Sequence, residues 1–322
     1  MQGSCGLNAT ELRAAARGVE VAGFAPAANI NGALPMEKPG QTARTGDRSS
    51  FQVTDEQRRE FLGRAGDAVK FVNGMKQGEH RMPSIEMSDN AGLVRSVEYT
   101  AIAASAGVLH SLMGDNAEAD RLLDVIANED IVKRDGNGQV TIGPENAQES
   151  TLASLWTSIL ARSRGRIAFA EQQGFREDLH MQSNVRPGGQ LAGSGLYVRK
   201  GSPVDCPQTY MNALIGFAYA QKGEYETARR LLESMSDLIP RYSNGLYHIS
   251  AEMDTFKKYG RGNADVALMT ALHAILALGA EHAEAEWGAV VKLEFNNTLR
   301  FEGTQTRILA GIMFAMVAGR VL

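Results

Sequence analysis

Cysteine is scarce in this sequence, with only Cys5 and Cys206 among 322 residues. Two thiols exclude a disulfide framework and a zinc site made of four cysteines. Basic residues are not in excess either, because 33 Lys and Arg stand against 37 Asp and Glu. The net charge of -4 argues against a nucleic-acid-binding surface, which needs surplus cations to neutralise phosphates.

Long apolar runs are also missing. The longest, residues 308–317, lies between Arg307 and Arg320 and falls short of the roughly 18 residues that a transmembrane helix needs. We therefore expect a soluble protein without a membrane-spanning segment. No basic segment precedes an apolar one at the start, so no signal peptide is expected. Cys5 would suit a trimmed lipoprotein, but an ordinary thiol near a chain end is the simpler interpretation. The compartment, cytoplasmic or exported, stays open.

Cofactor motifs are absent as well. The sequence has no phosphate-binding P-loop, and no glycine fingerprint for a dinucleotide follows a strand. The six histidines are scattered and never show the i, i+4 spacing of a metal site on a helix. We expect no cofactor and no bound metal.

Composition and periodicity divide the chain into an arm and one domain. Residues 1–50 are rich in Ala, Gly, Pro, Asn and Thr, which predicts an arm or linker, partly irregular. The periodic domain, residues 51–322, begins with a capping box at residues 54–57. A helix should follow, with one apolar face made of Phe61, Leu62, Ala65, Ala68, Val69 and Val72.

The domain then repeats one unit, an apolar helix followed by an amphipathic helix. We predict such pairs at 93–113 with 118–127, 149–161 with 164–173, 208–221 with 225–238, and 263–278 with 281–290. A last apolar helix is predicted at 304–321. The first and third pairs match at an offset of 109, so that Gly107 falls on Gly216 and Gly114 on Gly223. Such recurrence indicates a repeat architecture in which neighbouring units bury each other.

The connectors before the apolar helices repeat as well. Gly195-Leu196-Tyr197 recurs as Gly245-Leu246-Tyr247, 50 residues later, and the segment that begins at Gly138 is a weaker copy. Each predicts a short extended piece after a glycine turn.

This plan resembles the six-hairpin glycosidase-like superfamily over roughly residues 54–322. The resemblance implies an all-α fold, an (α/α) toroid in which an outer ring of helices wraps an inner ring. Long connectors at one end would then build an active-site cleft. The predicted elements are a first helix, four helical pairs and a last helix. This is fewer than the six helical hairpins of that superfamily. Terpene cyclases share the plan, but their clustered aspartates are absent here, and one scaffold hosts many activities.

The toroid places residues near the starts of the inner helices around the central cavity. Glycoside hydrolysis needs two carboxylates across a sugar-sized gap. Asp205, between two prolines, is the leading catalytic candidate, followed by Glu149 and Asp265. The helix dipole favours the ionised form of such acids, which suits a base or nucleophile. Acids at helix starts are also ordinary capping residues, and this alternative stays open.

Sugar rings have apolar faces that stack on aromatic side chains, and their hydroxyls suit charged partners. We predict that the substrate-binding residues are Glu98, Arg95, Tyr197, Tyr210, Tyr247 and His248. The partner would be an oligosaccharide or another small ligand in a central cavity. Alternatively, Tyr197 and Tyr247 pack between hairpins, and the arginine forms a structural ion pair.

The leading functional hypothesis is a carbohydrate-active enzyme. A glycoside hydrolase would use Asp205 with Glu149 or Asp265, whereas a polysaccharide lyase would use Tyr247 or Tyr210 with His248. The alternatives are a non-catalytic helical-repeat scaffold and a terpene-cyclase-like toroid with an apolar cavity. Two carboxylates 5 to 10 Å apart would favour hydrolysis, whereas a filled centre would favour the scaffold.

Overall fold

The computed structural model describes residues 53–76, 79–88, 94–141, 151–182, 195–200, 207–241, 245–248, 264–296, 299–301 and 303–322. Of residues 84–88, 94–98, 181, 182 and 199 it describes the backbone alone. The described part is mostly helical, which confirms the all-α class. None of its helices has the length and apolar character needed to cross a membrane. The predicted arm, residues 1–50, lies outside it.

Helix α2 (Asp55–Gly74) begins as predicted. The Thr54 hydroxyl accepts a hydrogen bond from the Gln57 backbone N–H, and the Gln57 side chain accepts one from the Thr54 N–H. These two bonds satisfy free donors of the first turn. Four of the six residues of the predicted apolar face are buried, namely Phe61, Ala65, Ala68 and Val72. Leu62 and Val69 are only partly buried.

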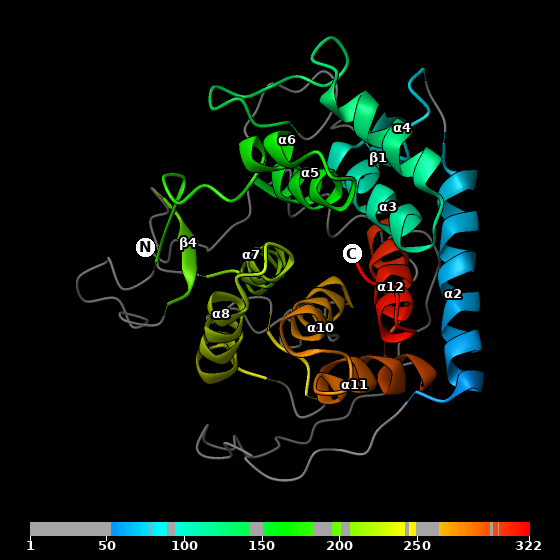
Figure 1. Cartoon of the computed structure of the whole chain (residues 1–322), viewed down its shortest axis with the longest axis vertical. Coiled ribbons are helices and arrows are strands. Elements are labelled where there is room, and N and C mark those ends of the chain that lie inside the picture. Colours follow the sequence, from blue (N-terminus) through cyan, green and yellow to red (C-terminus); the bar gives the residue numbers. More distant parts are fainter. Residues whose placement is uncertain are drawn as a thin grey trace.

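The predicted helical pairs are present. They are α3 (Thr100–Leu112) with α4 (Asn116–Ala127), α5 (Thr151–Ser163) with α6 (Ile167–Gln172), α7 (Thr209–Gln221) with α8 (Tyr225–Leu238), and α10 (Ala264–Leu278) with α11 (Glu284–Phe295). The last helix, α12 (Thr304–Val317), packs against α2. Figure 1 shows α3, α5, α7, α10 and α12, here called the inner helices, around a common centre. The outer helices α2, α4, α6, α8 and α11 lie outside them.

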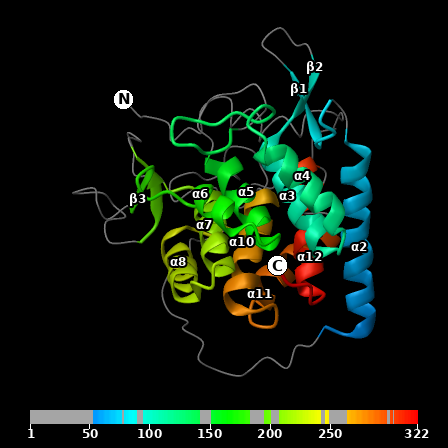
Figure 2. The ribbon, with the colours of Figure 1, turned by 45° about the horizontal axis from the view of Figure 1, so that its top comes forward.

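One predicted helix start is wrong. Residues 94–98 form strand β2 (Val94–Glu98), which pairs antiparallel with β1 (Ser84–Ser88), and α3 begins only at Thr100. The β-branched Val94 and Val97 tolerate an extended backbone, and a pairing partner ten residues upstream decides the outcome. Figure 2 shows the two strands projecting beyond α3. A second small sheet pairs β3 (His180–Gln182) with β4 (Tyr197–Arg199).

The inner helices contact one another in a continuous sequence. α3 packs on α5, α5 on α7, α7 on α10, α10 on α12, and α12 on α3. Glycine is the eighth residue of α3, α7 and α12, and it faces the tenth residue of the next helix. The three facing pairs are Gly107 with Leu160, Gly216 with His273, and Gly311 with Leu109. The absence of a Cβ lets these helices approach closely.

The ends of the inner helices repeat in the same way. A glycine with positive φ follows each of them: Gly114, Gly165, Gly223, Gly279 and Gly319. After four of these helices the next N–H bonds back to a carbonyl five residues earlier, as Asp115 does to His110. This is the Schellman arrangement, in which glycine adopts the left-handed backbone without a steric penalty.

The connectors are extended, as predicted. Gly138, Gly195 and Gly245 have positive φ. The residue two positions later pairs with the segment after the preceding outer helix, in the bridges Arg134–Val140, Gln182–Tyr197 and Arg241–Tyr247. Backbone pairing therefore links each of these connectors to the helical pair that precedes it in the chain.

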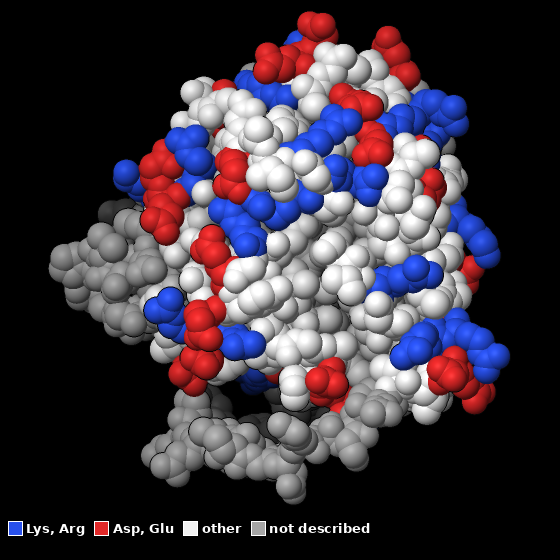
Figure 3. Space-filling model, viewed as in Figure 1, with Lys and Arg blue, Asp and Glu red and all other residues white. Residues whose placement is uncertain are grey.

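Charged side chains lie mostly over the outer helices. Figure 3 shows Lys, Arg, Asp and Glu in mixed groups around the edge of this face and uncharged residues over much of its middle. Arg164, in the turn after α5, bonds both oxygens of Asp120 in α4 at 2.8 and 3.0 Å. Arg166 reaches Asp124 on the same helix. Such ion pairs link neighbouring units, although exposed pairs contribute little to stability individually.

Candidate functional site at the amino ends of the inner helices

A cluster of polar and aromatic side chains gathers where the inner helices begin. Tyr210, Asp265 and Gln305 are the second residues of α7, α10 and α12. The Tyr210 hydroxyl accepts hydrogen bonds from Gln305 Nε2 at 2.6 Å and from Trp156 Nε1 in α5 at 3.3 Å. With their neighbours they form what we call the rim cluster: Tyr99, Trp156, Tyr210, Asp265, Gln305 and Thr306.

Asp265 is the carboxylic acid of the rim cluster. The Thr306 hydroxyl donates a hydrogen bond to its Oδ1 at 2.5 Å. Burial raises the pKa of Asp265 above its usual range, and the Thr306 hydrogen bond only partly opposes this. Desolvation therefore outweighs the helix dipole, which would favour the ionised form. A carboxyl with a raised pKa suits the role of proton donor.

Burial also raises the pKa of the Tyr210 phenol, and the nearby Asp265 and Tyr99 act in the same direction. The two N–H groups from Trp156 and Gln305 oppose that rise. Tyr210 therefore keeps its proton at neutral pH and offers a hydroxyl rather than a phenolate.

The rim cluster has a buried floor and a partly exposed edge. Tyr99, Trp156 and Thr306 are buried, whereas Tyr210 and Asp265 keep intermediate exposure. Gln305 is also partly exposed, as is Leu152, the second residue of α5. The edge thus combines hydrogen-bonding groups with apolar surface, which suits a ligand that is polar on one side and apolar on the other.

The structure brings together two of the predicted site residues, Tyr210 and Asp265. Two predicted catalytic acids, Asp205 and Glu149, lie outside the described residues. Arg95 and Glu98 lie in β2, of which only the backbone is described. Their roles stay predictions.

Tyr197 and Tyr247 are buried between helical pairs. The rings of Tyr197 and Phe175 pack edge to face, with their centroids 4.9 Å apart. The Tyr247 hydroxyl lies 2.7 Å from Ser236 Oγ, and Arg241 stacks over its ring at 3.9 Å. These contacts agree with the packing role that was the alternative above, and the predicted role of both side chains in substrate binding stays a prediction.

His248 joins its connector to the start of α7, because its carbonyl accepts a hydrogen bond from the Thr209 hydroxyl at 2.6 Å.

Sequence reasoning missed Trp156, Gln305, Thr306 and Tyr99 as members of the site. The available signal was the register of the repeat, since residues 210, 265 and 305 share the second position of their helices. Helix starts read from sequence carry an error of one or two residues, and this error was enough to hide the alignment.

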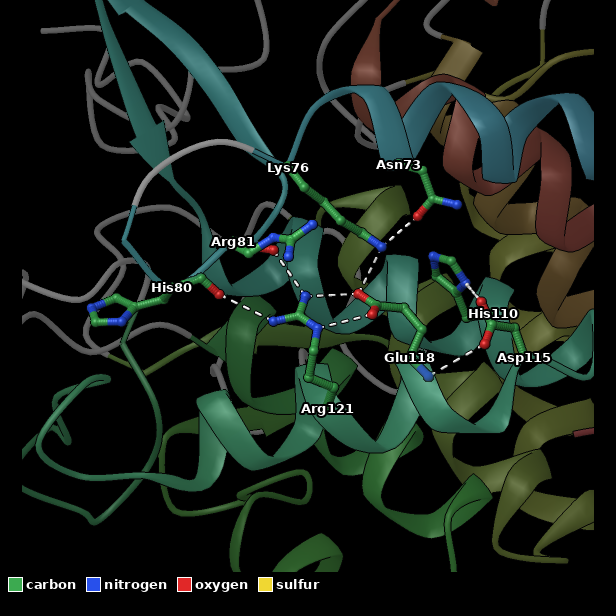
Figure 4. A network of polar contacts seen from close by, with 8 residues as sticks. All are labelled: Asn73, Lys76, His80, Arg81, His110, Asp115, Glu118 and Arg121. Carbon is green, nitrogen blue, oxygen red and sulfur yellow. Dashed lines mark hydrogen bonds and ion pairs between the residues drawn. The ribbon is translucent and has the colours of Figure 1, made fainter.

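A second polar network, which includes no residue of the rim cluster, lies where α2 ends (Figure 4). Glu118 in α4 binds Lys76 Nζ at 2.7 Å and Arg121 through two bonds of 2.7 and 2.8 Å. Arg121 also donates to the carbonyls of His80 and Arg81. The network fastens the chain after α2 to α4, which is a structural role.

Two hollows lie away from the rim cluster. A groove of about 560 Å³ between α2 and α11 is lined by Glu60, Arg64, Val291, Glu294, Phe295, Leu299, Arg300 and Phe301. A cavity of about 60 Å³ lies beside Tyr247 and Glu286. Within the described ranges no three His, Cys, Asp or Glu side chains gather as metal ligands would.

Comparison of the chain with protein-family models, with curated proteins and with solved structures found no match. The chemistry of the rim cluster is therefore the basis for a functional assignment.

Proposed function

We propose that this protein is a carbohydrate-active enzyme built as a closed (α/α) toroid of five hairpins, with its site at the rim cluster. The fifth hairpin pairs α12 with α2, so that the two ends of the domain close the ring. The contact of α12 with α3 supports closure. At this contact Gly311, the eighth residue of α12, faces Leu109, the tenth residue of α3. Gly107 and Gly216 face the next inner helix in the same eighth-to-tenth register.

The pairing of α12 with α2 in the fifth hairpin is tested at Gly311, where an added Cβ would lie 2.7 Å from the Cβ of Ala68 in α2. Gly311→Ala should lower the free energy of unfolding, and Ala68→Gly should restore part of it in the double variant. Residues in contact show such coupling, whereas distant residues give additive effects. Additive effects of the two substitutions would contradict the packing of α12 on α2 that the fifth hairpin requires.

The observation that carries the enzymatic proposal is the convergence of the rim cluster. Three consecutive inner helices contribute Tyr210, Asp265 and Gln305 from the same position, over the buried Trp156. Hydroxyl and amide donors beside an apolar floor suit a sugar ring, and a carboxyl with a raised pKa suits the acid of glycoside cleavage.

In this proposal Asp265 gives its proton to the glycosidic oxygen while the bond from that oxygen to the anomeric carbon breaks. A water molecule adds its hydroxide to that carbon, and its proton goes to a second carboxylate. Asp205 and Glu149 are the sequence-based candidates for this second carboxylate. A lyase would instead pass a ring proton of a uronate to a base, for which His248 is the sequence-based candidate, while the bond from the neighbouring ring carbon to the linkage oxygen breaks. Tyr210 would then give its proton to that leaving oxygen.

The test is a glycan panel with neutral and uronate-containing polysaccharides, assayed for new reducing ends and for unsaturated products. Asp265→Asn should lower cleavage by at least 100-fold, within the range assigned to general acid catalysis. Asp237→Asn, on the outer helix α8, is the matched control and should leave cleavage unchanged. Cleavage that survives Asp265→Asn at the wild-type rate would contradict the role of Asp265.

A non-catalytic binding scaffold is the second candidate, and one observation favours it. The middle turns of the inner helices are buried on all sides, so any ligand would bind at the rim and not in a deep central channel. Sugar binding without cleavage on the same panel would favour this candidate. The packed middle turns also speak against a large apolar cavity of the terpene-cyclase kind.

A further inference from the structure

The Tyr210 hydroxyl has little acceptor capacity left. Its oxygen already accepts N–H groups from Gln305 at 2.6 Å and from Trp156 at 3.3 Å. A phenol also has one O–H group that can donate a hydrogen bond. A further partner of Tyr210 would therefore accept a hydrogen bond from this O–H. We infer that Tyr210 binds the ligand as a hydrogen-bond donor, to an oxygen without a proton of its own. This inference rests on the proposed function and names the glycosidic ether oxygen as the atom held.

The two supporting groups fix the Tyr210 oxygen from different helices. Trp156 is 1% exposed and lies in the second turn of α5, and Gln305 lies in the first turn of α12. A hydroxyl held from two sides is oriented before the ligand arrives. Such preorganisation avoids the cost of ordering the group during binding.

Asp265 lies on the helix next to Tyr210 and occupies the same register. Helices α7 and α10 approach closely where Gly216 meets His273, and Thr306 holds Asp265 Oδ1. The Asp265 carboxyl and the Tyr210 hydroxyl thus lie at one edge of the rim. Tyr210 is a positioning residue that holds the leaving oxygen while Asp265 supplies the proton.

The inference predicts how affinity depends on the linkage atom of the sugar. The probes are cellohexaose, maltohexaose and hexagalacturonate, each compared with its sulfur-linked analogue, in the Asp265→Asn background that stops turnover. Sulfur is a weak acceptor. Tyr210→Phe should weaken binding of the oxygen-linked sugar about tenfold, the effect of one hydrogen bond. It should change binding of the sulfur-linked sugar less than about twofold.

Two further variants complete the experiment. Tyr225→Phe, at a tyrosine that is 47% exposed on α8, is the matched control and should leave both affinities unchanged. Gln305→Glu replaces an N–H donor by an acceptor that competes for the Tyr210 proton, so it should act like Tyr210→Phe. Equal weakening of both sugar types by Tyr210→Phe would overturn the inference and leave the proposed function standing.

A measurement without ligand tests the hydroxyl geometry independently. The chain has two tryptophans, so its nitrogen–proton correlation spectrum shows two indole signals. Tyr210→Phe should shift the Trp156 signal and leave that of Trp287, which donates to the Ala280 carbonyl at 2.8 Å, in place. An unmoved Trp156 signal would overturn the inference whatever binds. A shifted signal without binding of any probe would overturn the proposed function and the assigned ligand atom together.

Discussion

Gly216 in α7 lies directly against the imidazole of His273 in α10, and a Cβ on Gly216 would come within 2.2 Å of the ring. Gly216→Ala should therefore push the two inner helices apart. Overpacking costs about 1–3 kcal/mol, and better helix propensity returns at most about 1 kcal/mol. We expect a net loss in the free energy of unfolding, measured by urea denaturation.

Gly63→Ala is the matched control, because Gly63 also lies within a helix and has no atom near its Cβ position. This change should stabilise the protein by roughly 0.5–1 kcal/mol through helix propensity alone. Equal effects of the two substitutions would contradict the close packing of α7 against α10.

His273 makes the stability depend on pH. Burial lowers its pKa to about 4 from an ordinary value of 6.5, although the Ala228 carbonyl, which accepts a hydrogen bond from Nε2 at 2.8 Å, opposes the shift. Between these values the unfolded chain binds a proton that the folded chain does not. The contribution of His273 to the free energy of unfolding should thus be constant above about pH 6.5 and fall by about 3 kcal/mol toward pH 4.

Denaturation at several pH values checks this dependence. His110 acts in the same direction, because burial and Lys76 lower its pKa against the opposing effect of Asp115. His273→Gln should therefore flatten the curve between pH 4 and 6.5 without removing its slope. An unaltered slope in His273→Gln would show that this histidine binds its proton equally in the folded and the unfolded chain.

Glu118→Gln should destabilise the protein at neutral pH. Burial alone would raise the pKa of Glu118, but hydrogen bonds from Arg121 and Lys76 outweigh it and lower the pKa to about 2. The charge stabilises the fold above pH 4.5, and this contribution disappears as the pH falls toward 2. Loss of the carboxylate removes the ion pairs of Lys76 and Arg121, so we expect a cost somewhat below the roughly 3–5 kcal/mol of breaking a fully buried ion pair.

Glu226→Gln is the comparison for this substitution, because Glu226 also lies in the first turn of an outer helix but is exposed beside Arg229. Its effect on denaturation should be small. Similar costs at Glu118 and Glu226 would mean that the network of Figure 4 does not hold the chain after α2.

Asp265→Asn should stabilise the protein at neutral pH. A carboxyl with a raised pKa keeps its proton in the folded chain after the unfolded chain has lost it, so stability falls as pH rises through that window. Asparagine removes this penalty and still accepts the Thr306 hydrogen bond. Thermal unfolding at pH 7 should show a higher midpoint for Asp265→Asn. A lower midpoint would mean that a charged Asp265 is needed for the fold.

The local signals in the sequence predicted much of the architecture. The capping box at Thr54, the apolar helices and the glycines after them depend on interactions between residues a few positions apart. The start of α3 was misjudged because β2 depends on a partner strand, β1, that forms no helical pattern. Pairing between separate segments adds energy that propensity alone does not contain.

For the candidate site, too, some features followed from the sequence and others only from the tertiary structure. The sequence by itself determined the repeated helical pairs, and it made Tyr210 and Asp265 candidates because of their residue types near helix starts. Only the tertiary structure decided that they join Trp156, Gln305 and Thr306, which lie 41 to 95 positions away from their bonding partners. It also decided that Asp265 has a raised pKa, because desolvation depends on what the whole fold packs around a group.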